Sequence, residues 1–433
     1  MNWSRIERWS WYAFLVTASW QTRSILWHAG TTFSEWRSAA FWLSDAFIVL
    51  LVVLAVIRGW RIRNLDRVDR ALIVFVAAAS LSLVVAVDRR LSLVALARLA
   101  EFAVFFLYVR HWAVRHFNAD SSVLAFVVGA LAQAGLGIAQ FILQRDVGIR
   151  AVGETLLRTD MHGVAVFYSA TGEKILRAYG TLPHPNVLAA WLFVALAGIV
   201  WLYVRHGARD PLHRVIWAGA GTVLLWGMFL TFSRTVIAVA AVAAVVVAAA
   251  AFSDRFSAEW ANIAVIRKRL MHIGIVVITV VVAFAALYWP LVSARGTIHG
   301  SDEAVQLRID YARDALATGR GWHINWTGVG IGGFVPWLMR HAPSQPDYLY
   351  QPAHSLPLLV YAETGVIGIA VLVVFIILIT LQAWRSHRGQ PMLRIGILAL
   401  AGALVLISLT DHFFWTLQQG RILWWLVLAL AVG

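Results

Sequence analysis

The 433-residue sequence contains no cysteine. Disulfide frameworks, thiolate metal sites and thiol nucleophiles are therefore excluded. Charged residues are also scarce, at 13% of the chain, whereas hydrophobic residues make up 61%. A soluble protein of this size needs more polar side chains to cover its surface, so this balance indicates a membrane protein.

Lysine is almost absent as well, since Lys174 and Lys268 are the only two, and arginine supplies nearly all of the +14 net charge. Apolar runs of about 20 residues, the length that spans the hydrocarbon core, recur along almost the whole chain. They predict an all-α polytopic membrane protein with about twelve transmembrane helices. The predicted spans are 9–27, 41–57, 70–87, 91–109, 122–143, 184–204, 214–231, 233–252, 271–291, 356–382, 395–411 and 417–433.

Arginines cluster in alternate short connections between these spans. The clusters lie at 58–70, 110–115, 205–214, 255–269 and 385–394. Because positive loops stay in the cytoplasm, these connections and both termini are predicted to be cytoplasmic. We therefore expect one integral membrane domain over 1–433, with a shorter periplasmic segment at 144–183 and a large periplasmic loop at 292–355, between the ninth and tenth helices.

The large loop has recognisable structure. Residues 301–316 follow an amphipathic helical pattern with Asp302 as the expected N-cap, and Arg308 would project from this helix. The glycine-rich stretch TGVGIGGF follows at 327–334, where glycine permits positive φ and close backbone approach. The sequence thus predicts a partly helical loop.

His354 lies at the predicted external mouth of the tenth span, in PAHSLPLLVYAETGVIGI. A neutral imidazole has a reference pKa of about 6.5 and can accept a proton from a sugar hydroxyl, so a general base is chemically reasonable. The structural alternative is an interfacial histidine that caps the helix start with Ser355. Glu363, about two turns further on, would be costly if unpaired inside a membrane, so we expect it to support the site and not to act as a nucleophile.

The spacing of this stretch resembles a known family. His354, Ser355, nine residues, Gly365, two residues and Gly368 match the His-[Asn/Ser/Gln]-x9-Gly-x-x-Gly pattern of O-antigen ligases. Further blocks resemble the wider superfamily of O-antigen ligases, O-antigen polymerases and bacterial protein O-oligosaccharyltransferases. These blocks are RAYGTLPHPNVLAAWL at 177–192, TFSRT at 231–235, and RIDYARDAL with GVGIGGF within 308–334. The first five spans match in hydropathy only.

The resemblance implies a glycosyltransferase of the bacterial inner membrane, with its active site facing the periplasm. It would move O-antigen polysaccharide from undecaprenyl diphosphate to a sugar hydroxyl of the lipid A core. With His354 as the base, a single displacement inverts the anomeric configuration. The external loops lack clustered acids, so we expect no metal and no other cofactor, and the expected partners are these two glycolipids and membrane lipid, with no nucleic acid.

The leaving diphosphate develops negative charge, which guanidinium groups bind through paired hydrogen bonds. Arg234 in TFSRT and Arg308 are the leading candidates, followed by Arg177. Snorkelling to lipid phosphate is the structural alternative for Arg234, and a solvated helix face is the alternative for Arg308.

Four weaker candidates remain. His184 and Asn186 stand in the turn Pro183-His184-Pro185-Asn186 and could bind glycan or phosphate, but His184 is equally explained as an ordered turn residue. Arg98 is spaced to form a helical ion pair with Glu101, which favours a structural role. Glu363 completes the set.

Other functions stay open. An O-antigen polymerase or a protein O-oligosaccharyltransferase would share the chemistry and differ in the acceptor. About twelve spans would also suit a transporter of lipid-linked glycans. Alternating access, however, requires the arginine site to open to the cytoplasm, whereas the candidate arginines cluster on the predicted outer side. A non-catalytic glycolipid-binding or assembly protein would tolerate His354→Ala.

Overall fold

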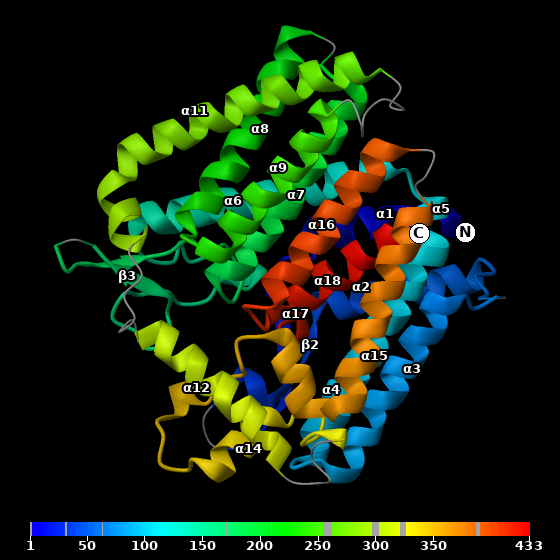
Figure 1. The fold of residues 1–433 in the computed structure, drawn as a ribbon, viewed down its shortest axis with the longest axis vertical. Helices are drawn as coiled ribbons and strands as arrows, with labels where there is room; N and C mark the ends of the chain where they lie inside the picture. Colours follow the sequence, from blue (N-terminus) through cyan, green and yellow to red (C-terminus); the bar gives the residue numbers. More distant parts are fainter. Residues whose placement is uncertain are drawn as a thin grey trace. The chain divides into compact units, whose positions relative to one another are not determined.

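The computed structural model describes residues 2–30, 33–62, 64–169, 171–208, 210–253, 262–296, 303–320, 326–386 and 390–433. Figure 1 shows the elements of the fold, and the chain forms two compact units. Unit 1 comprises residues 1–22, 116–298 and 387–404, and unit 2 comprises residues 23–115, 299–386 and 405–433. The single membrane domain expected over 1–433 stays a prediction.

Unit 1 is built from long apolar helices and one short hairpin. Its elements are α1 (Trp3–Thr17), α6 (Ala119–Leu143), η4 (Arg150–Val152), β3 (Val166–Tyr168), β4 (Lys174–Leu176), α7 (Pro185–His206), α8 (Pro211–Leu230), α9 (Arg234–Phe252), α11 (Ile263–Gly296) and most of α16 (Pro391–Ser408). Proline occupies the first turn of α7 and α8, where its missing N–H costs nothing.

The core of unit 1 lies where α6 packs against α1, α7 and α8. Gly129 permits the closest approach, because a Cβ there would lie 2.3 Å from the carbonyl oxygen of Val16. Against α7, Phe126 of α6 stacks on Trp191 with ring centroids 4.9 Å apart. The segment after α6 is therefore attached to a tightly packed helical base.

That segment, predicted as the shorter periplasmic region, is ordered by one buried carboxylate. Glu154 accepts hydrogen bonds from the backbone amides of Val147 (2.7 Å), Gly148 (2.7 Å) and Ile149 (2.6 Å) and from Nε2 of Gln140 (2.8 Å). A buried carboxylate with this many donors is well satisfied. The loop is thereby tied to α6.

Unit 2 combines a hairpin with the helices that follow it. Its elements are β1 (Arg23–His28), η1 (Glu35–Arg37), β2 (Ser38–Trp42), α2 (Leu43–Ile57), α3 (Arg67–Leu81), η2 (Ser82–Val85), α4 (Arg89–Tyr108), the π-helical turn η3 (Val109–Ala113), α5 (Val114–His116, which ends at the border with unit 1), α12 (Glu303–Ala317), η5 (Thr318–Arg320), α14 (Phe334–His341), η6 (Asp347–Leu349), α15 (Leu356–Ser386), α17 (Phe413–Thr416) and α18 (Gln418–Val432). Strands β1 and β2 pair antiparallel, and α3 runs beside α15 (Figure 1).

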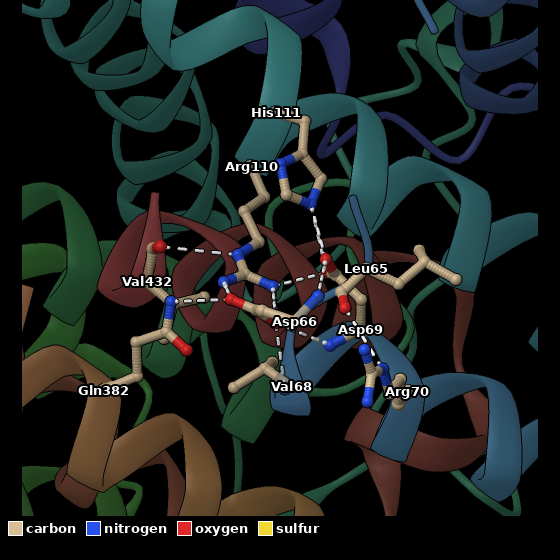
Figure 2. Close-up of polar contacts among 9 residues, drawn as sticks. All are labelled: Leu65, Asp66, Val68, Asp69, Arg70, Arg110, His111, Gln382 and Val432. Carbon is tan, nitrogen blue, oxygen red and sulfur yellow. Dashed lines mark hydrogen bonds and ion pairs between the residues drawn. The ribbon is translucent and has the colours of Figure 1, made fainter. Parts of the chain in front are cut away.

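A buried arginine anchors the start of α3 (Figure 2). Arg110 bonds both Asp66, the N-cap of α3, and Asp69 in its first turn, and Nε of Arg110 donates to the carbonyl of Val432 (3.3 Å). Gln382 of α15 also donates to Asp66, at 3.0 Å. Burial opposes ionisation of Asp66, but the hydrogen bonds from Arg110 and its neighbours outweigh burial and hold the Asp66 pKa well below its usual range.

Replacing Arg110 with methionine should strongly destabilise unit 2. The change removes the guanidinium from Asp69, whose side chain is fully buried, and leaves it the 3.0 Å contact with the His111 ring. Breaking a buried arginine–aspartate pair costs about 3–5 kcal/mol. Thermal unfolding in detergent measures the effect, with exposed Arg115→Met as the control. Equal melting temperatures for the two variants would show that the Arg110 cluster is not a structural anchor.

The glycine-rich turn docks on a break in α15. Gly365 interrupts this helix with φ +70°, and a Cβ there would lie 2.3 Å from the backbone of Trp326. Gly328, with φ +73°, meets the Glu363 backbone equally closely. The amides of Val329 and Gly330 donate to the carbonyls of Ala362 (2.9 Å) and Glu363 (3.0 Å). The contact is backbone on backbone, which only glycine permits here.

Gly365→Ala should therefore lower the melting temperature clearly, because both the positive φ and the backbone overlap penalise a Cβ. Gly402→Ala in α16 is the matched control, since a Cβ there meets nothing within 4 Å and alanine favours a helix by up to about 1 kcal/mol. If Gly365→Ala melts no lower than the Gly402 variant, the close docking described above is wrong.

The polytopic all-α fold is confirmed in its coarse form. Eight of the described helices are long and apolar enough to cross a membrane, and α2 and α18 are shorter apolar helices, so the number twelve stays a prediction. The predicted first span was wrong at its end: α1 stops at Thr17, and residues 23–28 form β1. The helix expected at 301–316 appears as α12, while Ser301 and Asp302 lie outside the described residues.

Candidate active site

His354 lies two residues before α15 in unit 2. Its ring stacks on Tyr311 of α12, with centroids 5.7 Å apart and planes 15° apart. The ring of His412 meets it edge-on at 5.1 Å. Tyr311 is itself fixed, because its hydroxyl donates to the carbonyl of Leu349 at 2.5 Å. Two aromatic contacts thus hold the imidazole plane.

The surroundings favour a neutral imidazole. Burial lowers the pKa of His354, Asp411 partly offsets this effect, and the positive charge of Arg308 lowers the pKa further. Nδ1 of His354 is buried and has no hydrogen-bond partner among the described residues. When the ring proton is on Nε2, the lone pair of Nδ1 is therefore available to accept a proton.

His412 was missed by the sequence analysis. It precedes α17, where Nδ1 lies 2.7 Å from the Thr416 hydroxyl and the backbone N–H donates to Asp411 at 2.8 Å. Burial, and then the charge of His354, lower the His412 pKa to about 3. The available signal was the Asp411-His412 pair at the end of the eleventh predicted span, which falls on the same predicted external side as His354 before the tenth span.

Arg308 lies on the exposed side of α12. Its charge acts on both His354 and His412, which places the guanidinium near the histidine pair. Within the described part of the chain, Arg308 has no hydrogen-bond or ion-pair partner. An unpaired arginine beside a neutral histidine can bind an anion.

Glu363 and Arg98 are held by other side chains of unit 2. Glu363 is buried and accepts a hydrogen bond from Nε1 of Trp415 at 2.8 Å. Arg98 forms the expected ion pair with Glu101 at 2.8 Å and a second one with Asp45 at 2.6 Å. The contacts of Arg98 are structural.

Three other predicted residues, Arg177, His184 and Asn186, come together in unit 1. Nε of Arg177 donates to the carbonyl of Thr231 (2.6 Å), and Nη2 donates to Oδ1 of Asn186 (2.9 Å). Nδ1 of His184 caps α7 by accepting from the amide of Asn186 at 3.1 Å. Arg177 is buried, so its visible role is to hold the turn before α9.

Arg234 is the first residue of α9 and is half-buried. The turn before it is tight, since Phe232 adopts φ +46°. Nη1 of Arg234 lies 3.4 Å from the carbonyl oxygen of Arg295. The start of a helix and a guanidinium both favour negative charge, so this position suits a phosphate.

Across the described ranges, no group of three His, Asp or Glu side chains is arranged to hold a metal ion. That the reaction needs no metal stays a prediction.

Residues 219–373 match a family model described as O-antigen ligase. This segment belongs to the O-antigen ligase family. The match contains Arg234, Arg308, His354 and Glu363, whereas Arg98, Arg177, His184 and Asn186 lie outside it. A comparison with curated proteins finds no match. This match supports glycosyltransferase activity of the O-antigen ligase and polymerase type on a lipid-linked polysaccharide, and the apolar helices support a multi-pass membrane protein.

The charges around His354 predict the pH dependence of the enzyme. Loss of kcat/KM on acidification should begin below the ordinary histidine value of about 6.5, because burial lowers the His354 pKa. Arg308→Gln removes a positive charge and should move this acid limb to higher pH, whereas Asp411→Asn should move it to lower pH. Profiles of kcat/KM against pH measure both shifts, and a limb unmoved in both variants would exclude His354 as the titrating group.

Proposed function

We propose that this enzyme transfers O-antigen polysaccharide from undecaprenyl diphosphate to a sugar hydroxyl of the lipid A core at the periplasmic face of the inner membrane. His354 accepts the proton of the acceptor hydroxyl. The acceptor oxygen then bonds to the anomeric carbon as the bond from that carbon to the diphosphate oxygen breaks. One displacement inverts the anomeric configuration, and undecaprenyl diphosphate leaves.

The observation that carries this proposal is the environment of His354. A general base must be neutral at the working pH and have a free lone pair within reach of its substrate. Burial and the neighbouring Arg308 favour the neutral form, and Nδ1 has no partner within the described residues. The residue also lies within the segment that matches the family.

Arg308 is the proposed ligand of the leaving diphosphate in unit 2. Its guanidinium is exposed and close enough to lower the pKa of His354, so its charge is available at the position where the diphosphate becomes more negative. Arg234 is proposed as a further diphosphate ligand, on the strength of its place at the start of α9. Arg177 is proposed to act through the Thr231 turn that precedes Arg234.

An O-antigen polymerase or a protein O-oligosaccharyltransferase would use the same base and differ only in the acceptor. The His354-to-Gly368 spacing supports the ligase. A transporter would have no need for a histidine whose buried Nδ1 lacks a partner among the described residues. The acceptor assay below separates these functions.

The test is transfer from a purified undecaprenyl-diphosphate-linked polysaccharide to lipid A core, with and without a chelator. His354→Ala should reduce kcat by at least about 100-fold, the usual contribution of a general base, and should still bind the donor. The control is His341→Ala, because His341 is an exposed histidine of the same unit that stacks on Trp337.

Glycan transfer by His354→Ala at the wild-type rate would contradict the role of His354 as general base. Product formed on a second lipid-linked unit or on a peptide, but not on lipid A core, would assign the polymerase or the oligosaccharyltransferase. Movement of the donor across the membrane without a covalent product would indicate a transporter, and loss of transfer on chelation would overturn the metal-free mechanism.

A further inference from the structure

Unit 2 contains a cavity of about 120 Å³ beside the histidine pair. One water needs about 10–15 Å³ of such space, so the cavity can hold several waters or a sugar ring. Trp36 and Thr416, which line it, are also the residues that touch His412, at 5.3 Å between ring centroids and 2.7 Å between Oγ1 and Nδ1. The cavity therefore adjoins the candidate active site.

One buried acceptor in the lining has no partner. Gln418 is 2% exposed and donates through Nε2 to Asp45 and to the Ser44 hydroxyl, at 3.1 Å for the latter. A carboxylate can only accept, so the amide nitrogen must face Asp45 and the amide oxygen must point elsewhere. Among the described residues, this Oε1 has no hydrogen-bond partner. Leaving a buried acceptor unsatisfied is unfavourable unless a ligand or water donates a hydrogen bond to it.

The remaining lining combines aromatic rings with planar polar groups. Trp36, Trp42 and Trp415 contribute rings, and Arg421 and Glu363 contribute charged groups. The guanidinium of Arg421 is held at Nε by the carbonyl of Trp415, at 2.7 Å. Flat apolar faces next to fixed donors and acceptors suit a sugar ring, whose C–H faces are apolar and whose hydroxyls both donate and accept.

The charges of the lining disfavour the other ligands of this enzyme. Arg98 is already bonded to the carboxylates of Asp45 and Glu101, and Arg421 shares the cavity with Glu363. Little net positive charge is left for a diphosphate. The same charged groups exclude a polyprenyl or acyl chain, because that chain would desolvate them without offering a hydrogen bond.

We propose that this cavity is a binding subsite for an uncharged sugar ring of a glycan substrate, with Oε1 of Gln418 accepting a hydrogen bond from a sugar hydroxyl. The proposal rests on the glycosyltransferase function proposed above and adds a second recognition site beside His354. The glycan can come from the acceptor or from the donor, and these two sources differ in their sugars and can be tested separately.

The experiment measures equilibrium binding by titration calorimetry on the full-length protein in detergent. The probes are the core oligosaccharide cut from lipid A and, separately, the O-antigen polysaccharide released from its carrier. Gln418→Met keeps the side-chain length and removes the acceptor oxygen, so it should weaken binding of one probe about tenfold, the usual effect of one hydrogen bond. Val94→Phe, which adds volume to the lining, should weaken binding of the same probe.

Gln382→Met is the matched control, because Gln382 also donates to an aspartate, Asp66, but lies outside the cavity lining. Weaker binding of the core oligosaccharide assigns an acceptor subsite, and weaker binding of the released polysaccharide assigns a donor subsite. Unchanged binding of both probes by folded Gln418→Met and Val94→Phe, or no binding by the wild type, overturns the proposal. His354→Ala should lose transfer and keep probe binding, so failure of the base mechanism is visible separately.

Discussion

The contact on which the rest of unit 2 depends is between two stretches of backbone. The turn at Gly328 and Gly330 hydrogen-bonds to the carbonyls of Ala362 and Glu363, just before α15 breaks at Gly365. A side chain at Gly328 or Gly365 would occupy the space of the opposing backbone. His354 begins the segment that leads into this break, and Glu363, held by Trp415, ends it. The nine-residue spacing of the motif is thus the length of helix between the proposed base and the docked turn.

This geometry explains which parts of the site could be read from the sequence. His354 lies just before α15, and Gly365 and Gly368 lie within it, so their spacing is visible in one short stretch of sequence and carried the resemblance to O-antigen ligases. The helical pattern around Arg308 was visible for the same reason, because it depends on residues within two turns of each other. Most helix positions also followed from hydropathy, since a membrane-spanning helix must satisfy its backbone internally.

Contacts between distant segments were not predictable in this way. The ring of His412, just before α17, contacts the ring of His354, and Nε2 of Gln418 donates to Asp45 although 373 residues separate the two in the sequence. Arg177 looked like a phosphate ligand, but its bonds to Thr231 and Asn186 depend on how two separate turns come together. The strand at 23–28 was taken as helix because Ile25, Leu26 and Trp27 extend the first apolar stretch, and a short apolar run does not by itself distinguish a strand from the end of a helix.

The two neighbouring histidines differ in a way that assigns their roles. A base works best when its pKa lies near the working pH, because it must be neutral before the reaction and still hold the proton during it. Burial lowers the His412 pKa to about 3, and its Nδ1 is engaged by Thr416, so it would hold a proton poorly. Burial also lowers the pKa of His354, but Asp411 opposes that shift. Nδ1 of His354 has no hydrogen-bond partner within the described residues. A neutral His412 also avoids placing a second positive charge beside the imidazolium that His354 becomes, which keeps proton transfer to His354 favourable.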